Sequence, residues 1–243
     1  MLSVPHVASF RTGDHICLFY RNADERAATL VPFVQVGLLL NERCVCILPP
    51  DEALGLKEAL AQGGIRVEAA ERKGSLRLIT PEESYLRGGE FSASAMVELL
   101  RGEVLQALAS GFHGFRAAGD LAWAVRAPGC YPELAEYEST LAEFVPALPA
   151  RGLCMYDLRL FGPEQMDELM RLHRLAVSHP SPSTCSIRLR RHDGFGDVVF
   201  AHDHPHRFSY TVRKDHSSAH VSAGHALNLT AALRAIETSL AKS

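Results

Sequence analysis

The sequence has no apolar run long enough to cross a membrane, which takes about 20 consecutive apolar residues. Its first residues have neither the basic start nor the apolar core of a signal peptide. The formal net charge of −3 offers no basic surface for nucleic acid. These absences predict a cytoplasmic protein without direct membrane or nucleic-acid binding. In that compartment its six cysteines are expected to be reduced thiols.

Motifs for catalysis and for phosphate binding are also missing. There is no G-x-S-x-G, no H-E-x-x-H, no paired zinc cysteine motif and no G-x-G-x-x-G. The turn at residues 20–29, after the first apolar segment, stands where many α/β proteins hold phosphate, but it contains neither glycine nor lysine. Asp24 and Glu25 in this turn would repel phosphate. We therefore expect no nucleotide binding, no enzymatic activity and no cofactor.

What the sequence does contain is an alternation of short apolar segments with longer segments of helical period, from about residue 15 to 175. Crossovers of helical length join parallel strands, so we predict an α/β fold of three layers, with helices on both faces of a parallel sheet. Pro32 is expected early in its helix, where its missing N–H costs nothing. The predicted strands are 15–20, 43–49, 75–80, 114–120 and 152–161, and the predicted helices are 31–40, 51–64, 94–109, 131–148 and 162–177.

The pattern changes at Ser178. Residues 178–185 are rich in serine and proline and are predicted to be a linker. Beyond them the sequence alternates with period two, and a closing helix is predicted from Asn228. We therefore divide the chain into residues 1–178 and a small β-rich appendage with one helix, residues 179–243. Beyond the linker, the appendage holds seven of the twelve histidines. Three of these alternate and would suit zinc or nickel, but Pro205 interrupts strand pairing, so we favour a polar turn and assign no metal to His202, His204 and His206.

Several unusual motifs occur in one unbroken order over roughly residues 9 to 178: "GDHICLFYRNADE", "GSLRLITPEESYLRGGEF", "GFRAAGDLAWAVR" and "LCMYDLRLF". This stretch resembles the MEDS family, the methanogen/methylotroph sensory domain. The resemblance implies a RecA-like fold of the circadian-clock ATPase type without the nucleotide-gripping loop. It also implies sensing of small organic compounds, such as one-carbon or halogenated hydrocarbons, beside a DNA-binding, histidine-kinase or anti-sigma output module. No such module is recognisable in residues 179–243.

Open parallel sheets bind ligands beyond the carboxyl ends of their strands. We therefore predict a small-molecule pocket at this edge, lined by aromatic walls and a few polar groups. Asp120 and Asp157 end two strands, and they are either pocket residues or caps of the following turns. His15 and Cys17 share one face of the first strand. They could form the floor of the pocket, belong to the core or act as a thiol–imidazole pair. Two residues alone do not make a metal site. The predicted ligand-binding residues are His15, Cys17, Tyr20, Tyr85, Asp120, Trp123, Tyr156 and Asp157.

The function predicted from these observations is that of a bacterial signalling protein. It would bind a small, largely apolar organic molecule and relay its state to a regulatory protein, such as a kinase, a sigma factor or a transcription control protein. One alternative is a thiol- or metal-dependent enzyme that uses His15 and Cys17 or the histidine-rich appendage. A second alternative is a protein-binding scaffold without a ligand. The sequence leaves a homodimer open.

Overall fold

The strands of the chain form one sheet in the order β10-β9-β8-β7-β6-β1-β5-β4-β2-β3. The computed structural model describes residues 10–87, 89–126, 130–181, 184–191, 194–204, 207–214 and 220–226. The parallel half of the sheet comprises β1 (His15–Tyr20), β2 (Arg43–Ile47), β3 (Leu76–Ile79), β4 (Phe115–Asp120), β5 (Ala150–Asp157) and β6 (Leu175–Ser181). The antiparallel half comprises β7 (Thr184–Arg191), β8 (Gly194–His204), β9 (Arg207–Lys214) and β10 (His220–Ala226).

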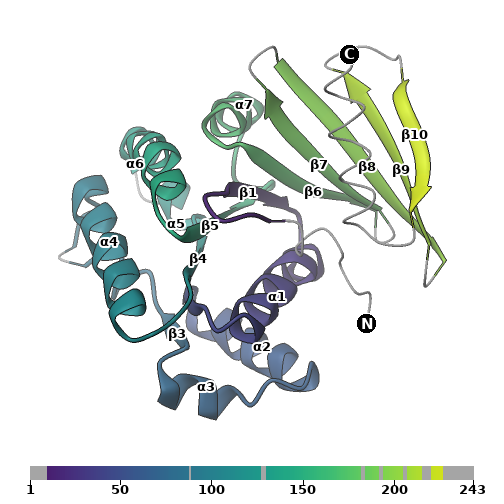
Figure 1. Cartoon of the computed structure of the whole chain (residues 1–243). Coiled ribbons are helices and arrows are strands. Elements are labelled where there is room, and N and C mark those ends of the chain that lie inside the picture. Colours follow the sequence, from purple (N-terminus) through teal and green to yellow (C-terminus); the bar gives the residue numbers. More distant parts are fainter. Residues whose placement is uncertain are drawn as a thin grey trace.

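Helices cover both faces of the parallel half (Figure 1). Ile16 and Leu18 of β1 pack in one buried cluster with the first three helices, whereas Cys17 and Phe19 pack in a second cluster with the later helices. Successive side chains of a strand point to opposite faces, so this division follows from the sheet itself. The predicted three-layer α/β fold is confirmed. One face carries α1 (Ala23–Leu39), α2 (Pro50–Gln62) and α3 (Val67–Lys73), and the other carries α4 (Ala93–Ala109), α6 (Cys130–Phe144) and α7 (Pro163–Leu172); α5 (Trp123–Arg126) and the 3-10 turn η2 (Val145–Ala147) are short.

Helix α1 begins earlier than the sequence predicted. Asn22 is its N-cap, so Pro32 lies inside the helix and not in its first turn. The early residues of α1 are mostly exposed or half-buried, and the apolar period that marks the helix becomes visible only from Leu30. The hydrogen bond lost at Pro32 is tolerated because the residues around it, Val31 and Phe33, are buried in the core.

The stretch predicted as a linker is largely sheet. Leu175, Ala176 and Val177 are buried, and β6 pairs in parallel with β1 up to the partners Phe19 and Ser178. The predicted boundary at residue 178 therefore falls inside a strand, and the predicted last helix ends at Leu172. The register with β7 shifts between Ser178 and Ser181, so the polar residues that suggested a linker stand where pairing is interrupted.

The extension beyond β6 is β-rich, as predicted. Strands β7 to β10 continue the sheet away from the helical layers (Figure 1). The closing helix predicted from Asn228 lies outside the described residues. Within the part of the chain that the structure describes, no helix has both the length and the apolar character that a membrane span requires.

Candidate functional site

A cleft of about 480 Å³ lies at the carboxyl edge of the parallel sheet. Strands β1 and β5 end side by side there, with Tyr20 and Asp157 as register partners. The chain leaves β1 toward α1 on one face and leaves β5 toward α7 on the other. Such a divergence is a topological switch point, where open α/β sheets bind ligands. Four residues predicted from the sequence line this cleft: Tyr20, Asp120, Trp123 and Asp157.

A hydrogen-bonded network occupies the floor of the cleft. The Tyr20 hydroxyl donates to Asp120 Oδ2 at 2.5 Å, and Arg26 Nη1 lies 3.2 Å from the same oxygen. Arg26 Nη1 also lies 2.5 Å from Glu52 Oε2 of α2. Burial and then the negative charge of Asp120 raise the pKa of Tyr20, so it remains a neutral donor. Burial alone would lower the pKa of Arg26, but Glu52 outweighs it and the pKa is raised.

The two strand-end aspartates also cap the turns that follow them. Asp120 Oδ1 accepts from the Ala122 backbone N–H at 2.9 Å, so this carboxylate serves both the turn and the cleft. Asp157 accepts from the Arg159 backbone N–H at 2.9 Å and from the Arg159 guanidinium. The lining therefore contains two guanidinium groups beside the acids, in addition to the aromatic and polar groups that the sequence predicted.

At the N-terminus of α1, next to the cleft, two backbone N–H groups are already bound by side chains. The Asn22 side-chain oxygen accepts from the Glu25 N–H at 2.9 Å, and Glu25 Oε2 accepts from the Arg21 N–H at 2.9 Å. A phosphate bound at a helix N-terminus would need such N–H groups. The Glu25 N–H, one of these donors, is bound to the side chain of Asn22.

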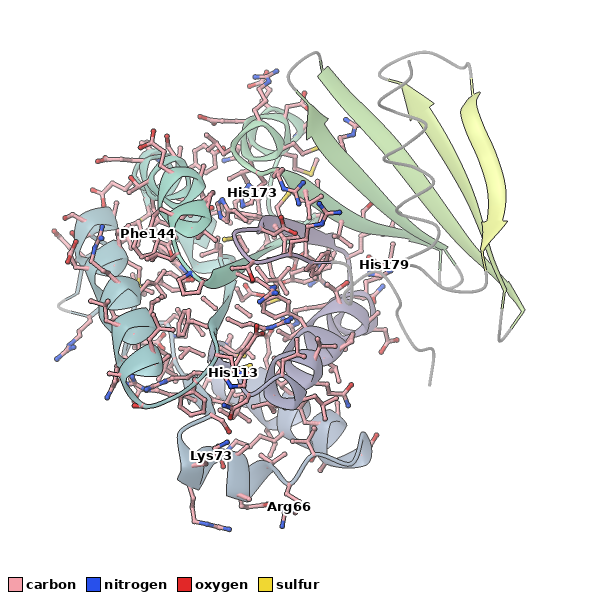
Figure 2. All side chains as sticks on the ribbon, in the orientation of Figure 1. Arg66, Lys73, His113, Phe144, His173 and His179 are labelled. Atoms are coloured by element: carbon pink, nitrogen blue, oxygen red, sulfur yellow. The ribbon has the colours of Figure 1, made fainter. Side chains whose placement is uncertain are left out.

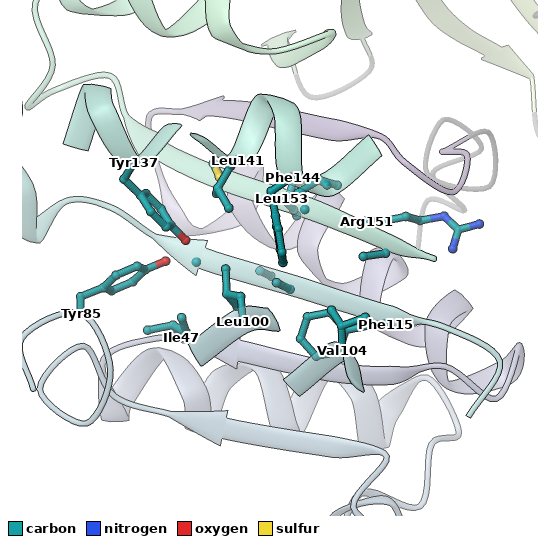
Figure 3. A pocket seen from close by; sticks show the side chains of 17 residues that line it. Ile47, Tyr85, Leu100, Val104, Phe115, Tyr137, Leu141, Phe144, Arg151 and Leu153 are labelled. Atoms are coloured by element: carbon teal, nitrogen blue, oxygen red, sulfur yellow. The ribbon is translucent and has the colours of Figure 1, made fainter. Parts of the chain in front are cut away.

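The other four predicted residues lie in the core outside the cleft lining. Tyr85 stacks on Trp123, with ring centroids 5.0 Å apart. Its hydroxyl faces that of Tyr137 at a small void beneath the cleft (Figure 3), and the two hydroxyls are hydrogen-bonded. This void has a volume of only about 30 Å³, enough for one or two water molecules but not for an organic ligand. Tyr156 is fully buried against Phe19.

His15 and Cys17 do not form a reactive pair. Cys17 is fully buried, and burial, followed by the charge of Glu138, raises its pKa well above the usual value. A thiol in such surroundings is a poor nucleophile. The His15 ring instead contacts Glu138, Cys154 and His173, which come from α6, β5 and the residue after α7.

Glu138 and His173 were not predicted from the sequence as site residues. The signal that could have found Glu138 is its spacing, because it lies on the buried stripe of α6 with Leu134 and Leu141. A carboxylate at such a position needs a partner. Figure 2 shows His173 below α7, where the chain turns into β6.

His202 and His204 belong to β8, and the register with β9 shifts between them. His206 lies outside the described residues, and so do the side chains of the other two.

Comparisons with known proteins agree with this architecture. The family model of the MEthanogen/methylotroph, DcmR Sensory domain (MEDS) matches residues 14–174. The transcriptional repressor DcmR of Methylorubrum extorquens is 26% identical over 176 residues, which cover 71% of this chain and 62% of the repressor. The chain thus spans less than two thirds of that relative. A KaiC-like protein from Pyrococcus horikoshii OT3 has a TM-score of 0.53 at 13% identity, covering 81% of this chain and 88% of that chain. This likeness concerns the fold, and it confirms the RecA-like architecture.

Proposed function

Since the chain belongs to the MEDS family of sensory domains, we propose that it binds a small organic molecule in the carboxyl-edge cleft and passes the bound state to a regulatory partner. The observation that carries this proposal is the network of Tyr20, Arg26 and Asp120 on the cleft floor. It offers convergent polar groups beside the Trp123 ring, and the cleft volume of about 480 Å³ lies within the usual range for small-molecule sites.

The lining favours a neutral ligand. Asp120, Asp157 and Glu52 would repel an anion, and the guanidinium groups of Arg26 and Arg159 already neutralise part of this charge. The prolines of the rim and Trp123 supply apolar surface. Small halogenated or one-carbon compounds, the class suggested by the family, would fit this combination of one apolar wall and a few hydrogen-bonding groups.

The connection from the cleft to the extension supports a relay. Arg21, in the turn that precedes α1, donates from its guanidinium to the His179 carbonyl of β6. The Thr29 hydroxyl of α1 lies 2.9 Å from His179 Nε2. A ligand that displaces Arg26 from Asp120 would move α1 and so act on β6, the strand on which β7 to β10 are built. The role of DcmR as a transcriptional repressor supports an output in transcription control. We propose that this chain exerts it through a regulatory protein.

Replacement of Tyr20 by Phe is expected to weaken the response to such ligands about tenfold, because the buried Asp120 oxygen loses one of its two donors while the ring is kept. The measurement is a thermal-shift titration of the full chain with a panel of halogenated and one-carbon compounds, since a ligand that binds only the folded state raises its stability. Tyr131→Phe is the matched control, because the Tyr131 hydroxyl donates to Glu168 outside the cleft. An equal loss in both variants would contradict the assignment, and a protein that no compound stabilises would favour the scaffold alternative.

We propose further that the cleft does not serve ATP chemistry. The full chain is expected to show no hydrolysis of Mg-ATP and no thermal shift with it, because the turn before α1 lacks glycine and lysine and carries Asp24 and Glu25. Steady-state phosphate release is the measurement. Hydrolysis that disappears in Asp120→Ala would contradict this expectation and would indicate that the domain is an ATPase.

A further inference from the structure

Four buried side chains converge on one point between the sheet and helices α6 and α7. Glu138 Oε2 lies 3.1 Å from His15 Nε2 and 3.2 Å from His173 Nε2. His15 Nε2 lies 3.4 Å from Cys154 Sγ, and one ligand atom from each of the four residues lies within 4.8 Å of the others. Their exposed fractions range from 0% for Glu138 to 6% for Cys154. The chain brings them together from β1, α6, β5 and the end of α7.

The arrangement of the two imidazoles leaves their Nε2 atoms directed at the carboxylate. His173 Nδ1 lies 2.8 Å from the Leu169 carbonyl oxygen, so Nδ1 carries the proton and donates it to this oxygen. In neutral His173 the Nε2 atom then presents a lone pair to Glu138 Oε2. Among the described residues, the Glu138 oxygens and His173 Nε2 have no hydrogen bond of regular geometry, and the two imidazoles lie beside the carboxylate. Lone pairs that face each other at this distance in the core require either a proton or a metal ion between them. The convergence of four ligand atoms on this point favours the metal ion.

We propose that His15, Glu138, Cys154 and His173 bind a divalent transition-metal ion, with zinc as the best fit. Tetrahedral zinc holds nitrogen at about 2.0–2.1 Å and sulfur at about 2.3 Å, so its ligand atoms lie roughly 3.2–3.6 Å apart. The three measured separations, 3.1, 3.2 and 3.4 Å, are close to this range. Thiolate and imidazole ligands favour zinc over magnesium or calcium.

The net charge of the four side chains and the hydrogen bond that orients His173 also suit such an ion. One divalent cation with the Glu138 carboxylate and a Cys154 thiolate sums to zero, which a fully buried site requires. The bond from His173 to the Leu169 carbonyl fixes the tautomer, as the outer partners of metal-bound histidines usually do. Since all four positions are filled by protein, the site is structural. It would fasten the junction of α7 and β6 to β1 and β5.

The test uses the full chain purified without a histidine tag and without chelator. Elemental analysis is expected to find one zinc ion per chain bound at this site. After chelation and titration with Co²⁺, the protein is expected to show the visible absorption of four-coordinate cobalt and a sulfur-to-cobalt charge-transfer band. Because the extension also carries a cysteine, Cys185, it is the loss of this band in Cys154→Ser that separates the proposed site from binding by the histidines of the extension.

Cys154→Ser is expected to abolish the charge-transfer band, and His173→Ala is expected to weaken Co²⁺ binding by about 100-fold or more. Cys46→Ser is the matched control, because Cys46 is equally buried but lies on β2 outside the cluster. Circular dichroism of each variant establishes whether it is folded. The cobalt spectrum of the wild type tests the site even if a variant does not fold. Absence of bound metal and of the band in the wild type, or a band unchanged in Cys154→Ser, would overturn the proposal. Neither result depends on the ligand proposed for the cleft.

Discussion

A chain that ends at Arg174 is expected to be insoluble or molten, whereas a chain that ends at Ser181 is expected to fold. The difference between them is β6, which lies beside β1 in the parallel half of the sheet. Leu175 and Val177 belong to the same buried cluster as Ile16 and Leu18. Burial of each such side chain contributes about 1.5–3 kcal/mol. Together with the lost strand pairing, this approaches the 5–15 kcal/mol that typically stabilises a whole domain.

The chain that ends at Ser181 keeps the contacts that fasten β6. These are the hydrogen bond between Thr29 and His179 and the hydrogen bond from the Arg21 guanidinium to the His179 carbonyl. Circular dichroism in the near ultraviolet, binding of a hydrophobic dye and thermal unfolding distinguish a folded core from a molten one. If the chain that ends at Arg174 folds cooperatively, β6 does not belong to the core. If neither chain folds, the antiparallel strands belong to one cooperative unit with the parallel half, and a division near residue 178 has no physical basis.

Replacement of Glu42 by Gln is expected to lower the free energy of unfolding by about 3–5 kcal/mol. The Glu42 carboxylate accepts from Arg116 Nε at 2.5 Å and from Arg151 Nη1 at 2.6 Å. Arg116 is only 1% exposed, and burial lowers its pKa although Glu42 counteracts this. Because the amide keeps the shape of the side chain and removes its charge, two guanidinium groups would be left without a counter-charge.

Urea unfolding at neutral pH measures this loss. The control is Glu98→Gln, because Glu98 is 70% exposed and pairs with Arg101 on the surface of α4. The control is expected to change the unfolding free energy by less than about 0.5 kcal/mol. Equal losses in the two variants would show that the buried network has no special role in stability.

The sequence alone determined five of the six strands in the parallel half of the sheet and the character of its carboxyl edge. Strands β1 to β5 are continuous apolar segments separated by helical periods, and this local pattern survives in a single sequence. The missing glycine and lysine after Tyr20 were equally visible. The ends of parallel strands share one edge, so Tyr20, Asp120 and Asp157 could be assigned to it without a structure.

Only the tertiary structure decided which of these residues meet. The hydrogen bond between Tyr20 and Asp120 joins residues 100 positions apart, and the contact of His15 with Cys154 spans 139. Periodicity within one segment carries no information on such pairs. β6 was missed for a related reason: its serines and proline resemble a linker, and only pairing with β1 and β7 makes this segment a strand. Glu138 and His173 stand on helical segments as ordinary polar residues, and their significance arises from the packing of α6 and α7 against β1 and β5.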